Sequence, residues 1–73
     1  ICGIDTDCCV LATALDLFEN NIHPVVLSYY SASNGGEKSH QAALTIFSRL
    51  IGMSNVIEES VDKQKIMRYL LVD

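Results

Sequence analysis

Basic residues are scarce in this sequence and do not cluster. Only five of its 73 residues are Lys or Arg, against nine Asp or Glu, so the net charge is −4. The five are scattered between Lys38 and Arg68, which leaves no positive surface that could follow a phosphate backbone. We therefore do not expect nucleic acid as a partner.

Long apolar runs are missing as well. No stretch approaches the roughly 18 residues that a membrane-spanning helix needs. No charged segment followed by an apolar one and a small-residue cleavage site marks a secretory signal. We expect a soluble, cytoplasmic protein without a membrane partner.

The cysteines fit none of the common disulfide, redox or phosphatase patterns. Their number is odd, and Cys8 is adjacent to Cys9, where a vicinal disulfide would strain the backbone. The sequence has no CxxC, GxGxxG or GxxxxGK[ST], so thioredoxin-like, dinucleotide-binding and P-loop functions lack their residues. A phosphatase loop needs Arg six positions after its Cys, and Cys8 stands there when the count starts at Cys2. Cys8, Cys9 and the two histidines match no zinc module, so we expect no metal site among them.

Strand-like and helix-like segments alternate along the chain. Apolar runs predict strands at residues 1–4, 25–30 and 55–57. Amphipathic segments predict helices at residues 8–21, 37–51 and 62–71. This β-α-β-α-β-α order predicts an α/β fold with a parallel, Rossmann-like sheet and right-handed crossovers.

The chain is short for an independent domain of this class. A domain of 73 residues buries only about 60% of its unfolded surface. A parallel sheet of three strands also leaves faces and edges bare, and 49% of the residues are hydrophobic. We therefore expect residues 1–73 to be part of a larger three-layer α/β/α domain, and we expect a homo-oligomer.

One stretch places thiols where a strand gives way to a helix. It is GIDTDCCVLATALD, residues 3–16. Ligands of open α/β sheets bind at the carboxyl ends of strands, and residues 5–7 supply side chains that can cap the helix. The free amides and the helix dipole in that turn favour an anion. A thiolate at Cys8 or Cys9 would be a nucleophile, and the same amides could receive an oxyanion.

The same stretch resembles the nucleophile segment of the isochorismatase-like cysteine hydrolases, which include nicotinamidases and N-carbamoylsarcosine amidases. The shared pattern is Gly-x-x-Thr-[Asp/Asn]-x-Cys-Val followed by Ala/Thr-x-x-Asp. A looser likeness extends over the strand at residues 25–27 and over His40-x-Ala-Ala-Leu. The resemblance implies that the chain supplies the carboxyl-terminal part of the family's domain, about its last three β-α units.

The resemblance also assigns roles. The family's nucleophile is the Cys before Val, which is Cys9, and Cys8 takes the variable position. The resemblance implies a cis peptide bond between Ile4 and Asp5, and an oxyanion hole made by the backbone amides of Asp5 and Cys9. The family's general-base Asp, its assisting Lys and the metal ligands of nicotinamidases come from segments before this chain. We thus expect no cofactor in this chain, and a divalent metal only if the upstream part is nicotinamidase-like.

The pocket walls are expected at the end of the second predicted strand. Cys8, Tyr29, Tyr30 and Ser31 are the candidates; packing is the alternative for Cys8, and contact with the core or with another subunit is an equal alternative for the other three. The family often has Asp directly after this strand, where this chain has Ser28, so the details of the loop and pocket depart from the family pattern.

Three further residues are expected to be structural. Cys2 is expected in the core, because it lies in the middle of a predicted strand. His23 precedes Pro24 at a strand entry and is expected at the surface. His40 lies in the first turn of a predicted helix, where a structural hydrogen bond is favoured over substrate contact.

Together these residues predict a cysteine hydrolase that cleaves a small amide, as nicotinamidases do, through a thioester on Cys9. Isochorismatases proper cleave a vinyl ether and lack this Cys. The alternative is a catalytically degenerate family member that serves binding or oligomerisation. The upstream Asp and Lys would distinguish the two, and without them residues 1–73 alone are expected to be inactive.

Overall fold

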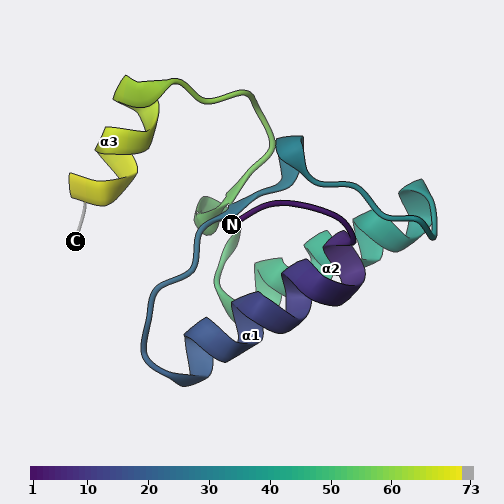
Figure 1. Cartoon of the computed structure of the whole chain (residues 1–73). Helices are drawn as coiled ribbons and strands as arrows, with labels where there is room; N and C mark the ends of the chain where they lie inside the picture. The colour runs from purple at the N-terminus through teal and green to yellow at the C-terminus, as the bar shows by residue number, and fades with distance from the viewer. Residues whose placement is uncertain (72–73) are drawn as a thin grey trace.

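The computed structural model describes residues 1–71, in which helices and turns alternate with two short strands (Figure 1). In chain order the elements are η1 (Thr6–Val10), α1 (Leu11–Glu19), β1 (Val26–Leu27), η2 (Ser28–Tyr30), α2 (Glu37–Leu50), η3 (Met53–Asn55), β2 (Val56–Ile57) and α3 (Lys63–Leu71). Here η1 is a π-helical turn, whereas η2 and η3 are 3-10 turns. This content confirms the predicted α/β class, and no helix within residues 1–71 is long and apolar enough to cross a membrane.

The first predicted strand is reduced to a single bridge. Residues 1–4 lie beside β1, because the N–H of Leu27 donates to the carbonyl of Ile1 at 2.8 Å. Ile4 then forms a parallel bridge with Ala32. On its other side β1 pairs in parallel with β2. Three chain segments therefore run in parallel, as predicted, but within the described residues only two are regular strands.

The second predicted strand ends earlier than expected. It was predicted to reach residue 30, yet β1 ends at Leu27 and η2 follows. The hydroxyl of buried Ser28 donates to the carbonyl of Ile57 at 3.2 Å. Tyr29, beyond the end of β1, is 59% exposed, rather than covered on both faces as an apolar strand run suggests.

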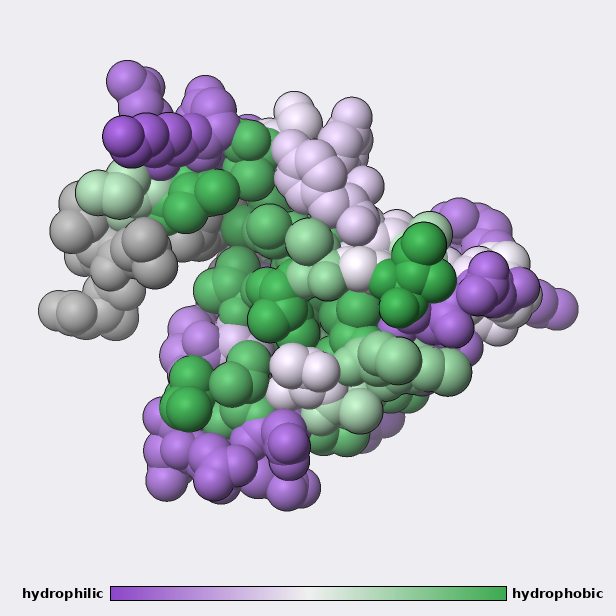
Figure 2. Space-filling view, viewed as in Figure 1, coloured by the Kyte–Doolittle hydropathy of each residue, from purple (hydrophilic) through white to green (hydrophobic). Residues whose placement is uncertain are grey.

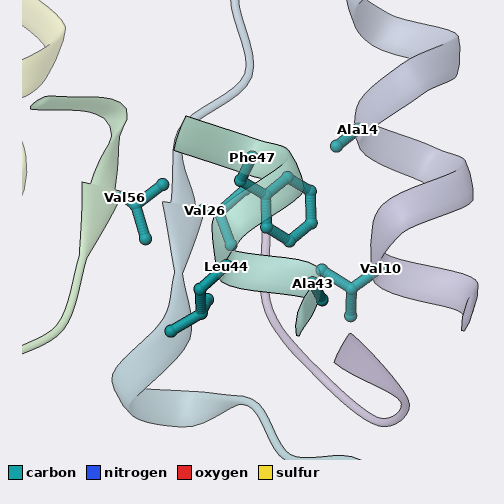
Figure 3. Close-up of a cluster of buried hydrophobic side chains, with 7 residues drawn as sticks. All are labelled: Val10, Ala14, Val26, Ala43, Leu44, Phe47 and Val56. Atoms are coloured by element: carbon teal, nitrogen blue, oxygen red, sulfur yellow. The ribbon is translucent and has the colours of Figure 1, made fainter. Parts of the chain in front are cut away.

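Helices α1 and α2 share one core with both strands (Figure 3). Its buried members are Val10, Ala14, Val26, Ala43, Leu44, Phe47 and Val56. Phe47 is fully buried and joins side chains of α1 to those of the strands. Helix α1 connects residues 1–4 to β1, and helix α2 connects β1 to β2. Right-handed crossovers that proceed in one direction across a sheet place their helices on the same face.

The residues that follow the two helices have left-handed backbone angles. Asn21, just after α1, has φ 60°, and Gly52, just after α2, has φ 85°. Glycine and asparagine adopt this left-handed region at helix ends most readily.

The prediction that Cys2 lies in the core is wrong. Cys2 is exposed, because side chains along residues 1–4 alternate between the two faces, as they do in any extended segment. Ile1 packs against the core, whereas Cys2 and Ile4 face away from it. On the face shown in Figure 2, hydrophobic residues form a broad central area with hydrophilic ones at its margins.

Candidate functional site

The cysteine pair lies in the first turn of the first helix. Helix α1 follows η1 without a break, so Cys8 and Cys9 belong to one continuous helical segment that starts at Thr6. Both thiols are exposed. The peptide bond between Ile4 and Asp5 is cis, as predicted. The pair thus stands at the carboxyl end of an extended segment that runs parallel to β1.

Asp5 does not cap the helix through its side chain, although such a cap was predicted. It occupies the N-cap position with extended backbone angles and makes no side-chain bond to the first turn. Its carbonyl instead accepts the N–H groups of Cys8 and Val10, both at 3.1 Å. Its carboxylate accepts the N–H of Asn34 at 2.7 Å. The carboxylate is therefore bound to the loop before α2 and not to the first turn of the helix.

The side chains of Thr6 and Asp7 are also bound by the loop before α2 and the first turn of that helix. Thr6, which is fully buried, has its Oγ1 2.7 Å from Nδ1 of His40. The hydroxyl of Ser33 donates to the Asp7 carboxylate at 2.6 Å. The predicted structural hydrogen bond of His40 is confirmed. Its partner was not predicted, because no local spacing rule connects residues so far apart in the chain.

The Cys8 thiol has negative neighbours. The Asp7 carboxylate, followed by burial and by the charges of Asp5 and Cys9, raises the pKa of the Cys8 thiol. Negative neighbours disfavour a thiolate. Cys8 therefore stays protonated to higher pH than an ordinary thiol.

The predicted pocket residues lie at the end of the neighbouring strand. Tyr29 and Tyr30 pack edge to face, with ring centroids 5.0 Å apart. The Tyr30 hydroxyl accepts the N–H of Val61 at 3.1 Å. Ser31 accepts the N–H of Gly3 at 3.1 Å and donates to a β1 carbonyl at 3.0 Å. Its hydroxyl thus connects the segment before the cysteines to β1.

A separate open groove of about 550 Å³ lies at the far ends of the helices. Phe18, Ile22 and Leu50 contribute its apolar walls. His23 also lines it and is exposed, as predicted, with Nε2 2.8 Å from Oδ1 of Asn55. This groove is at the opposite end of α1 from the cysteines. Across residues 1–71, no three His, Cys, Asp or Glu side chains converge as they would around a metal ion.

Comparison with known proteins gives one match. The family model described as the isochorismatase domain matches residues 1–58, which include the cysteine pair, both strands and helices α1 and α2. Comparisons with curated proteins and with solved structures give no match.

Proposed function

Because the chain belongs to the isochorismatase family, we propose that it serves a cysteine hydrolase in which Cys9 attacks the carbonyl carbon of a small amide. Membership supports hydrolase chemistry in general terms. The amide is our choice of substrate, because the resemblance places a nucleophilic Cys at position 9, and amide hydrolysis through a thioester requires such a nucleophile.

In this proposal the Cys9 sulfur adds to the carbonyl carbon, and the resulting oxyanion is received by the backbone N–H groups of Asp5 and Cys9. The C–N bond then breaks, and the amine leaves with a proton from an acid outside residues 1–73. Water attacks the thioester, releases the carboxylic acid and returns the thiol.

The observation that carries the proposal is the exposure of the Cys9 thiol at a fixed helix start. Val10 and Ala14, which follow it, are buried in the core, so the backbone at this position is held in place. The thiol itself remains accessible to a small molecule. The neighbouring Cys8, whose pKa is raised, does not offer an equivalent nucleophile.

We further propose that residues 1–73 form the carboxyl-terminal part of a three-layer α/β/α domain in a cytoplasmic homo-oligomer. The broad hydrophobic area in Figure 2 supports this proposal, because apolar surface of that kind is usually covered by other protein. The general-base Asp, the assisting Lys and any metal ligands would then come from the rest of the domain. Tyr29 and Tyr30, exposed at the end of β1, would line the pocket with Cys8 and Ser31.

The test is ammonia release by the complete protein from a panel of small primary amides that includes nicotinamide. Cys9→Ser should lower the rate on the order of 10³-fold or more, since it removes the nucleophile. Cys8→Ser, one residue away, is the comparison: Cys8 is proposed as a pocket wall, so its replacement should lower the rate far less than loss of the nucleophile. Loss of activity in the Cys8 variant with retention in the Cys9 variant would overturn the assignment. No release from any amide, together with an unreactive Cys9, would support the degenerate binding subunit instead.

A further inference from the structure

Three consecutive side chains just before the cysteine pair are bound by a single segment from elsewhere in the chain. This segment, residues 33–40, comprises the loop before α2 and the first turn of that helix. The three side-chain bonds are Asp5 to Asn34, Thr6 to His40 and Asp7 to Ser33. The start of the nucleophile helix is therefore fastened to the start of α2.

Thr6 is the most deeply buried of the three fastened side chains. It has no exposed surface, whereas Asp5 and Asp7 are half-buried. A buried hydroxyl without a partner costs more than a surface one, because water cannot replace the lost bond. His40 is the partner of that hydroxyl within the described residues.

His40 is also the more rigid anchor. It lies in α2, whose next turns carry the buried residues Ala43, Leu44 and Phe47. The loop residues Ser33 and Asn34 have no such support. A displacement of Thr6 would therefore be opposed by the whole core through His40.

We propose that His40 is a positioning residue for Cys9, acting through Thr6. The inference rests on the proposed function of Cys9 as the nucleophile. The imidazole holds the buried Thr6 hydroxyl, Thr6 fixes the first residue of η1, and Cys9 lies three residues further along the same turn. Loss of this bond lets the start of the helix shift against α2, so that Cys9 reacts more slowly although the fold persists.

The test is site-resolved alkylation of the complete protein with iodoacetamide, with the rate at Cys9 divided by the rate at Cys2. Cys2 is an internal reference, because it lies outside the helix, so the substitutions should leave its own rate unchanged and only the change of the ratio between variants matters. His40→Ala and Thr6→Val should each lower this ratio about fivefold, the factor that corresponds to one net hydrogen bond. His40→Asn and Thr6→Ser should keep the wild-type ratio, since each retains a polar atom that can form the bond.

Two controls separate positioning from general destabilisation. His23→Ala removes the other histidine, which is exposed and bonds Asn55 at the far end of the molecule, and should leave the ratio unchanged. Unfolding would speed alkylation of all the cysteines, whereas loss of positioning slows Cys9 alone. Thr6→Val keeps the shape of the buried side chain and removes only the hydroxyl. It therefore tests the Thr6–His40 bond even if His40→Ala fails to fold.

Unchanged ratios in His40→Ala and Thr6→Val, or a His40→Asn variant that behaves like His40→Ala, would overturn the inference. These outcomes are distinct from failure of the proposed function. In that case wild-type Cys9 would show no preference over Cys2, and Cys9→Ser would retain any hydrolase activity.

Discussion

Replacement of Phe47 by Ala should destabilise the protein more than any other single truncation in this core. Phe47 is fully buried and packs among Val10, Ala14, Val26 and Val56, so its removal leaves a cavity between α2, the nucleophile helix and both strands. Such changes cost about 3–5 kcal/mol. The free energy of unfolding of a native protein is about 5–15 kcal/mol. The loss is therefore a large share of the total stability.

Urea denaturation followed by far-UV circular dichroism measures this effect. The matched control is Phe18→Ala, which truncates the only other Phe in the sequence. Phe18 is 47% exposed, and its loss should cost about 1 kcal/mol or less. Equal losses for the two variants would refute the packing of α2 on α1 and the strands. Because Val10 follows Cys9 directly, Phe47→Ala should also loosen the helix start that carries the cysteines.

Three further predictions concern the site and the chain turns. Asp7→Asn removes the largest cause of the raised pKa of Cys8. Cys8 should then ionise at lower pH and react faster with iodoacetamide at pH 8. The control, Asp16→Asn on the exposed side of α1, should not change that rate. Gly52→Ala should cost about 1–3 kcal/mol, because φ is 85° there and the strain is that of the backbone alone; an unchanged thermal midpoint would contradict this. Tyr30→Phe removes the acceptor for the Val61 N–H and should cost at most about 1 kcal/mol, with faster hydrogen exchange at Val61; unaltered exchange would argue against this bond.

The sequence predicted the order of elements, because hydrophobic periodicity and helix-end residues are local signals. The parallel arrangement agrees with the structure, and so does the cis bond before Asp5 that the family resemblance implied. What it missed depends on contacts between distant residues. The burial of Cys2 was misjudged because one strand position does not reveal which face is covered.

The site shows the same division. The motif located the cysteine pair and the residues before it, but it suggested that Asp5 and Thr6 cap their own helix. In the structure these side chains bind Asn34 and His40 instead. Such bonds follow from the way α2 returns beside η1, which no short spacing encodes. The early end of β1 at Leu27 likewise reflects a bond from Ser28 to the distant carbonyl of Ile57.

The central claim, that Cys9 is the nucleophile, is tested most directly by the relative alkylation rates of the three cysteines at pH 6 in the complete protein. An ordinary thiol is only about 0.3% ionised at that pH, so unactivated cysteines label slowly. The account predicts that Cys9 is modified at least about tenfold faster than Cys2 and Cys8. Equal, slow labelling of all three, or preferential labelling of Cys8, would contradict it.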